Sequence, residues 1–390
     1  MEVEIKTKGT HEDGRIKTME DLIRECKVAL EKWTITDGGL NKWEVGAKNA
    51  KKEIVVEPLF QVRLKLERSI GNMLLPARGL PVGPAVIAGG PGWTEPGVKS
   101  ALFLPDFQIG YEWNEDFTYL KPFHDRQAID VALQLAQDMQ PNEIIILGDF
   151  LDLPPFGKFS AGRYKYVNTT QAAIEEGYCI LRDLRERCFK SRITFLIGNH
   201  EIRLENFLNK NAPEATRIRP AGEKSSPLKI RNLLRFDELR IEANDSYDKP
   251  MWLWDRICIR HGEEYTNLSA KKVSHTTVQG HGHGIVYSVK TVLSPVGPRI
   301  VTMMSPGCLC KTDGTVPGLS QNPDWQNGVG IAYLDTHIPN SQEHLSVLPI
   351  HAGILWHAGR QYRANTEEAL ALQAMKVTGI AALQEPQTKT

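Results

Sequence analysis

Two histidines separated by a single glycine are the residues of this sequence best suited to chemistry. They stand in the stretch Gly280-His281-Gly282-His283. Glycine tolerates turns that other residues avoid, so the stretch taken alone is also typical of a polar surface turn. Two neighbouring imidazoles are equally a pair of metal ligands. The choice depends on whether the rest of the chain supplies further ligands.

Further polar side chains follow short apolar runs, each where a strand is expected to end. Carboxyl ends of strands meet at one edge of an α/β sheet, so these side chains are expected to lie together. Their mixture of carboxylate, carboxamide and imidazole suits Mn²⁺, Fe²⁺ or Zn²⁺ rather than Ca²⁺. One carboxylate can bridge two such ions, an arrangement that fits in-line attack on a phosphate ester. In chain order these residues are Asp106, Gln108, Asp149, Asp152, Asn199, His200 and His261.

The five blocks resemble the signature of the calcineurin-like metallophosphoesterase superfamily over roughly residues 101–335. That signature runs Asp-x-His, Gly-Asp-x-x-Asp, Gly-Asn-His-Asp/Glu, His and Gly-His-x-His. Five ordered blocks are far more specific than any single motif. The resemblance implies a four-layer αββα sandwich with two mixed sheets flanked by helices. It also implies hydrolysis of phosphate esters by a hydroxide bridging two divalent ions, Mn²⁺ above all, with Fe²⁺, Zn²⁺, Ni²⁺ or Mg²⁺ as alternatives.

Carried over position by position, the resemblance makes Asp149 the carboxylate that bridges both ions. Asp106 and His283 would bind the first ion together with Gln108, which stands where the family has a histidine. A neutral carboxamide oxygen binds a transition metal more weakly than imidazole does. The sequence therefore predicts a weakly held first ion.

A replacement for the missing histidine is offered by "PFHDR", where His124 and Asp125 precede a predicted helix. Either side chain could fold back toward the strand ends. The alternative, which the sequence leaves open, is that Asp125 caps the helix and His124 is exposed. Similar Asp-x-Gln and "PFHD"-like variants occur among phage-type phosphoesterases, which "NPDWQNG" also resembles.

The second ion, by the same resemblance, would be bound by Asn199, His261 and His281 in addition to the bridging carboxylate. His200 resembles the family histidine that contacts the phosphate as a general acid or charge stabiliser. His200 and Asp149 are thus the predicted catalytic residues. Asp152 is expected to orient a neighbouring side chain.

The elements that must position these residues are visible from residue 101 onward, where short apolar runs alternate with helical stretches. Such runs are typical of strands buried on both faces. The intervening stretches have helical periodicity and predict helices that cover the sheets of an α/β fold. Strands are predicted within 101–106, 143–149, 193–199, 256–262 and 277–283, and helices over 125–139 and 169–188.

The rest of the chain predicts appendages to this domain. The first segment reads as a small α+β unit, a nucleic-acid-binding or oligomerisation module, with a helix over 18–33 and strands over 42–48 and 53–67. Dense Pro and Gly then predict a linker. The predicted boundaries are 1–75 for the N-terminal unit, 76–100 for the linker, 101–360 for the phosphoesterase domain, and 361–390 for a helix near 367–376 and a polar tail.

Composition limits the partners and the compartment. Lys plus Arg equals Asp plus Glu at 47 each, so a nucleic-acid surface would have to be local. The six dispersed cysteines fit reduced thiols, and Cys308-Leu-Cys310 is too closely spaced for the usual zinc pair, which predicts a structural role. A charged N-terminus and the lack of an apolar run of ~18 residues predict a cytoplasmic protein, in the host if phage-encoded, without a membrane partner.

Two basic stretches favour nucleic acid as the substrate. Residues 202–240 are rich in Arg and Lys, and "GKFSAGRYKY" places aromatic residues between basic ones. A solvated helical cap accounts for them equally well. The sequence therefore predicts a metal-dependent phosphodiesterase or nuclease acting on DNA or RNA. A phosphomonoesterase of protein or nucleotide and a non-catalytic metal-binding scaffold are the alternatives, and the oligomeric state is left open.

Overall fold

The structure of the 390-residue chain is a computed structural model, and it divides into two compact units, residues 1–78 and 79–390. Each unit is described by itself. The described residues are 2–6, 33–48, 54–68, 96–157, 163–244, 246–247, 249–262, 268–294, 297–317, 324–338, 340–366 and 369–370.

The first unit contains a three-stranded antiparallel sheet in the order β1-β3-β2. Its strands are β1 (Glu2–Lys6), β2 (Trp33–Lys48) and β3 (Ile54–Arg68). The two long strands include the alternating runs from which strands were predicted. The helix predicted over 18–33 lies outside the described residues, except that Trp33 begins β2.

The second unit is organised around a six-stranded mixed sheet in the order β16-β15-β4-β7-β8-β9. The four strands from β4 to β9 in this order are parallel, and β15 and β16 add to the edge antiparallel. The strands are β4 (Val98–Leu104), β7 (Glu143–Ile146), β8 (Arg192–Leu196), β9 (Ile241–Asn244), β15 (Gly328–Asp335) and β16 (His344–Pro349).

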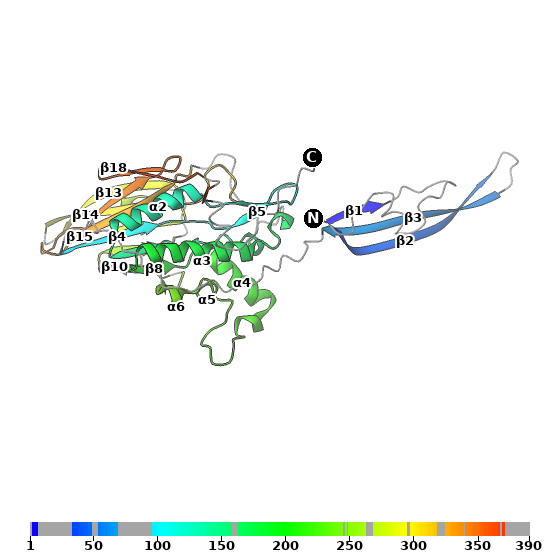
Figure 1. Ribbon diagram of the computed structural model, residues 1–390, viewed down its shortest axis with the longest axis horizontal. Helices are drawn as coiled ribbons and strands as arrows, with labels where there is room; N and C mark the ends of the chain where they lie inside the picture. Colours follow the sequence, from blue (N-terminus) through cyan, green and yellow to red (C-terminus); the bar gives the residue numbers. More distant parts are fainter. Residues whose placement is uncertain are drawn as a thin grey trace, which may run out of the picture. The chain divides into compact units, whose positions relative to one another are not determined.

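Two helices, α2 (Arg126–Met139) and α3 (Thr170–Arg187), cover one face of this sheet (Figure 1). Alternate residues of each strand point to opposite faces. On β4, Leu104 therefore packs under the helices while Phe103 packs against a second sheet. Both side chains are fully buried, which explains why the strand is apolar throughout.

The second sheet has five strands in the order β10-β11-β12-β14-β13 and is also mixed. Side chains from both sheets form one core between them, which confirms the predicted α/β class with two packed mixed sheets. In the described residues, the place of the second helical layer holds only the single 3₁₀ turn η4 (Ala270–Lys272), packed against β13 and β14. The strands are β10 (Met251–Leu253), β11 (Ile257–Arg260), β12 (Thr277–Gln279), β13 (Ile285–Ser294) and β14 (Gly297–Pro306).

Shorter elements complete the second unit. Between β8 and β9 the chain forms a cap that begins with α4, and no described helix is long and apolar enough to cross a membrane. The helix predicted near 367–376 lies outside the described residues apart from 369–370. These elements are β5 (Tyr111–Trp113), β6 (Leu120–Pro122), η1 (Pro154–Phe156), η2 (Arg163–Tyr166), α4 (Glu201–Asn211), η3 (Pro213–Thr216), α5 (Ile230–Leu233), α6 (Phe236–Leu239), β17 (Ile354–His357) and β18 (Arg360–Arg363).

Candidate metal centre

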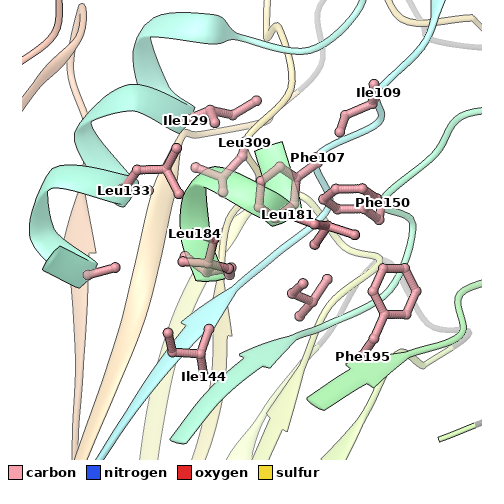
Figure 2. Packing of buried hydrophobic residues seen from close by; sticks show 14 of the residues in the cluster. Phe107, Ile109, Ile129, Leu133, Ile144, Phe150, Leu181, Leu184, Phe195 and Leu309 are labelled. Carbon is pink, nitrogen blue, oxygen red and sulfur yellow. The ribbon is translucent and has the colours of Figure 1, made fainter. Parts of the chain in front are cut away.

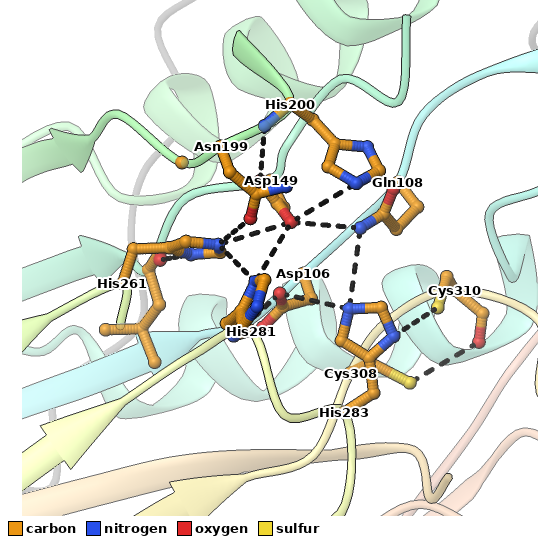
Figure 3. Close-up of polar contacts among 12 residues, drawn as sticks. Asp106, Gln108, Asp149, Asn199, His200, His261, His281, His283, Cys308 and Cys310 are labelled. Atoms are coloured by element: carbon orange, nitrogen blue, oxygen red, sulfur yellow. Dashed lines mark hydrogen bonds and ion pairs between the residues drawn. The ribbon is translucent and has the colours of Figure 1, made fainter. Parts of the chain in front are cut away.

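Five loops bring the predicted site residues together, because each loop follows a strand that runs parallel to its neighbour. In the first sheet these strands are β4, β7 and β8, and in the second sheet they are β11 and β12. Parallel strands end at the same edge of their sheet. Polar side chains from both sheets therefore meet at one place, as Figure 3 shows.

Phenylalanines anchor two of these loops in the core. Phe107 stands between the two polar residues of the first loop, and Phe150 directly follows Asp149. Both rings are buried, with centroids 4.7 Å apart, and Phe150 continues to Phe195 of β8 at 5.5 Å (Figure 2). Removing such a ring typically costs about 3–5 kcal/mol of stability. The packing of the loops is thus part of the core itself.

One donor group consists of Asp149, His261 and His281, whose ligand atoms lie within 4.8 Å of one another. His261 Nε2 is 3.2 Å from Asp149 Oδ2 and 3.1 Å from His281 Nδ1. Asn199 joins through its Oδ1, 2.9 Å from the same imidazole nitrogen. On the other side of the ring, His261 Nδ1 donates a hydrogen bond of 2.8 Å to the Leu147 carbonyl. Nε2 therefore keeps a lone pair for a cation, as metal-binding histidines do.

A second donor group consists of Asp106, Asp149 and His283, again within 4.8 Å. His283 Nε2 lies 3.2 Å from Asp106 Oδ1. Gln108 completes this group, because its Nε2 lies 3.3 Å from Asp149 Oδ2 and 3.4 Å from His283 Nε2. Asp149 belongs to both donor groups, and it is the only residue that the two have in common among the described part of the chain.

The charges of the site are concentrated on the shared carboxylate. Burial raises the pKa of Asp149, but His200 and His261 outweigh burial and hold that pKa well below its usual range. Burial lowers the pKa of His261, but the carboxylate and its hydrogen bond raise it to about 9. Buried anions need a compensating charge. Divalent cations between these donors would supply it, so the two groups fit divalent metal binding.

The side chain of Gln108 provides an independent test of this fit. Its Oε1 is buried without a hydrogen-bond partner, while its Nε2 makes two long contacts. Buried carbonyl oxygens normally have a partner. The two ends of an amide are interchangeable by a rotation of its plane. Rotated, Gln108 would direct its oxygen at Asp149 and His283, where a cation would lie.

Gln108→His is expected to lower the Mn²⁺ concentration needed for half-maximal metal binding at the first position. Imidazole is a stronger ligand of transition metals than a carboxamide oxygen, and changes around metal sites commonly alter affinity by about 10–100-fold. Metal titration of both proteins, followed by calorimetry, measures the difference. Gln171→His, on exposed α3 surface, adds a histidine away from the site and should leave the titration unchanged. An unchanged titration in Gln108→His would contradict this role of Gln108.

The Gly-His-Gly-His stretch is built from two successive three-residue turns. The N–H of Gly282 donates to the Gly280 carbonyl, and that of Gly284 to the Gly282 carbonyl, each at 2.7 Å. His281 and His283 are the central residues, with φ of 66° and 54°. These are γ-turns of the strained hand. One histidine consequently joins the first donor group and the other joins the second, as expected if each reaches a different ion.

Three more candidate ligands have the same left-handed backbone. Asp106, Gln108 and Asp149 have φ of 37°, 50° and 47°. Each such residue typically costs on the order of 1–3 kcal/mol unless its surroundings fix it. Gly280 must stay glycine, since a Cβ there would lie 2.9 Å from Asp106 Oδ2. The loops thus hold donor atoms in conformations that the backbone alone disfavours.

His200 lies beside the shared carboxylate without belonging to either donor group. Its Nδ1 is 2.5 Å from Asp152 Oδ1, and its Nε2 is 3.6 Å from Asp149 Oδ2. Its backbone N–H donates to Asp149 Oδ1 at 2.9 Å. Burial lowers the pKa of His200, but Asp149 and Asp152 together raise it. Asp152 therefore fixes the ring orientation and leaves Nε2 directed at the site.

His124 and Asp125 point away from these groups. His124 is fully buried, with its Nε2 2.8 Å from Glu176 Oε1, and burial holds its pKa well below the usual value. Asp125 caps α2 by accepting hydrogen bonds from the backbone N–H groups of Gln127 and Ala128. The capping alternative thus describes Asp125. The proposal that either residue replaces the missing histidine receives no support, and His124 is buried rather than exposed.

Two features of the site were not predicted from the sequence. Glu201, the last residue of the Gly-Asn-His-Glu block, accepts backbone hydrogen bonds from Asp149, Leu151 and Gly198 at 2.8–3.0 Å. Its carboxylate therefore ties the turn after β7 to the turn after β8. The motif itself was the signal, although it does not say what the glutamate binds.

The second unpredicted feature is a pair of thiols behind His283. Cys310 Sγ lies 3.9 Å from His283 Nδ1, and Cys308 Sγ lies within 4.8 Å of both donor atoms. Both cysteines are buried, and burial raises the pKa of the Cys310 thiol well above its usual value. The structural role predicted for this pair therefore includes contact with a candidate ligand.

Comparisons with known proteins give distant likenesses. No protein-family model matches the chain. The Gene 54 proteins of Mycobacterium phages D29 and L5 are 23% identical over 226 and 228 residues, which is 55% of this chain and 85% of each relative. A 5'-nucleotidase precursor from Thermus thermophilus has 11% identity and a TM-score of 0.29 over 73% of this chain, which spans 59% of that structure. So low a TM-score carries no argument about fold or activity.

Proposed function

We propose that this chain is a divalent-metal-dependent phosphoesterase of the calcineurin-like type, acting on the phosphodiester bonds of nucleic acid. The observation that carries the proposal is the buried Asp149, shared by two donor groups. A carboxylate between two ligand sets is what a two-metal phosphoesterase requires. A single structural metal would need only one set.

Two ions would be held by the two donor groups. When bound, they lower the pKa of water and offset the negative charge of a phosphate. Carboxylate, carboxamide and imidazole ligands favour Mn²⁺ or Fe²⁺ over Mg²⁺ and Ca²⁺, and we propose Mn²⁺. The proposed ligands are Asp106, Gln108, Asp149 and His283 for the first ion, and Asp149, Asn199, His261 and His281 for the second.

The proton for the leaving oxygen is assigned to His200. Asp152 holds its Nδ1, so Nε2 faces the site at 3.6 Å from Asp149 Oδ2. A general acid must be within hydrogen-bond reach of the oxygen that it protonates. His200 Nε2 is the imidazole nitrogen beside both donor groups that neither group uses.

The cap between β8 and β9 supports nucleic acid as the substrate. Residues 201–235 contain eight Lys or Arg against four Glu, so a basic surface follows His200 directly. Within the described chain, Arg217, Arg219, Lys224 and Lys229 are exposed and make no ion pair. Unpaired exposed cations of this kind attract phosphate backbones. The likeness to two phage proteins fits a nucleic-acid substrate without specifying one.

The experiment that tests the proposal is an assay of the full chain with Mn²⁺ against a panel of esters. The panel contains p-nitrophenyl phosphate, its bis ester, and labelled single- and double-stranded DNA and RNA. Cleavage of the bis ester and of a polynucleotide is expected. Preference for the monoester would make the protein a phosphomonoesterase instead. Binding of Mn²⁺ without hydrolysis of any ester would make it a metal-binding scaffold.

The cap makes a separate prediction about salt. Arg217→Ala combined with Arg219→Ala should weaken polynucleotide binding, and the slope of log affinity against log salt should fall by about 0.9 for each duplex phosphate that the cap no longer neutralises. Hydrolysis of the small bis ester should not change. Lys99→Ala with Lys190→Ala removes two exposed charges near the amino ends of β4 and β8 and serves as the control. Equal salt slopes for both double variants would show that the cap does not bind the backbone.

A further inference from the structure

Arg203 lies in the first turn of α4, beside the residue to which the proposed general-acid role is given. Its guanidinium NH1 donates to the Asp152 carbonyl at 2.8 Å and contacts Asp152 Oδ1 at 3.3 Å. Its NH2 lies 2.6 Å from His200 Nε2. The side chain is 22% exposed, so one edge of the guanidinium is open to solvent. One nitrogen is therefore anchored, and the other rests on the imidazole.

The contact with His200 is weaker than a guanidinium normally makes. Arginine has no lone pair to accept a hydrogen bond, so His200 Nε2 must be the acceptor. A neutral imidazole is a poorer partner for this cation than an oxyanion. Arginine is also charged at every relevant pH, which places a fixed positive charge next to two proposed cation sites. Such a charge opposes metal binding by repulsion and favours an anion at the same place.

The geometry points to Arg203 as a further catalytic residue, one that contacts the phosphate of the substrate. On binding, NH1 stays on Asp152, and NH2 exchanges its hydrogen bond with His200 Nε2 for one to a phosphate oxygen. No covalent bond changes in this step. The exchange also exposes Nε2 toward the leaving oxygen, so the imidazole becomes available only when a phosphate is present. This inference rests on the proposed phosphoesterase function.

The test uses the full chain loaded with Mn²⁺ and inorganic phosphate as the probe. Arg203→Met keeps the length of the side chain and removes its donors and charge. Phosphate affinity, measured by calorimetry, is expected to fall about 10–100-fold, the range of one charge-assisted hydrogen bond, with unchanged Mn²⁺ content. Arg182→Met, on the exposed face of α3, is the matched control and should bind phosphate as the unmodified chain does.

A conservative variant guards against a folding defect. Arg203→Lys keeps the charge but presents one ammonium in place of a planar fork, so it cannot hold Asp152 and phosphate in the same way. Its phosphate affinity should lie between those of Arg203→Met and the unmodified chain. A purely structural role predicts instead that both variants lose melting temperature and Mn²⁺ before they lose phosphate.

The outcomes separate this inference from the proposed function. If the unmodified chain binds phosphate but hydrolyses no ester, the function fails while the phosphate comparison still decides the role of Arg203. Unchanged phosphate affinity in Arg203→Met overturns the inference. So does a loss of phosphate that only follows a loss of Mn²⁺, and so does the lack of phosphate binding by the unmodified chain.

Discussion

Asp149→Asn is expected to lose metal and hydrolysis together. The carboxylate is shared by both donor groups, and a neutral amide cannot hold two cations close against their mutual repulsion. Two-metal stabilisation contributes several kcal/mol to such reactions, so turnover should fall by at least about 10³-fold. The amide can still accept the hydrogen bond that the His200 backbone donates to Oδ1 at 2.9 Å. The loop should therefore keep its shape.

Metal analysis of the purified variant measures the first part of this result, and hydrolysis of the bis ester measures the second. Asp183→Asn, which alters a partly exposed ion pair with Arg187 on α3, is the matched control. It should retain both the metal and the activity. Two ions per chain in Asp149→Asn would contradict the bridging role.

His200→Ala is expected to abolish turnover while leaving Mn²⁺ content intact. The imidazole belongs to neither donor group, and its Nε2 is the nitrogen placed for the leaving oxygen. General acid help is typically worth about 10²–10⁴ in rate. The loss should be largest for a polynucleotide, whose leaving alkoxide needs a proton, and smaller for the bis ester, whose nitrophenolate leaves without one.

His275→Ala is the control for this variant, since His275 stacks on Trp252 of β10 outside both donor groups. Turnover near that of the unmodified chain on a poor leaving group would remove the acid role from His200. Metal loss as large as that of Asp149→Asn would show that His200 acts through the ions.

Much of the site was predictable because strand ends carry their own signals. The apolar runs before Asp149 and Asn199 predicted β7 and β8, and both strands are confirmed in parallel register. Parallel neighbours place their following loops at one edge, so the order of the motifs was enough to predict that the side chains converge. The periodicity over 125–139 and 169–188 likewise predicted α2 and α3, which the structure confirms.

The remainder depends on contacts that no local pattern encodes. Glu201 bonds three backbone amides whose positions are set by two different strands. Arg203 meets Asp152 across 51 residues of sequence, and Cys310 meets His283 across 27. Such pairs depend on which loops the sheet brings together and on side-chain rotamers. His124 illustrates the same limit, because its position after a strand said nothing of the buried Glu176 that binds it.

The left-handed backbone of five proposed ligands has a consequence for the evolution of this protein. Asp106, Gln108, Asp149, His281 and His283 each occupy a conformation in which glycine would be more comfortable. Natural selection removes only variants that fall below the stability needed for function, so a lineage released from metal chemistry could drift to glycine at these turns and become more stable. A descendant that had lost its activity should therefore melt at a higher temperature than this chain freed of its ions, although its core would be unchanged.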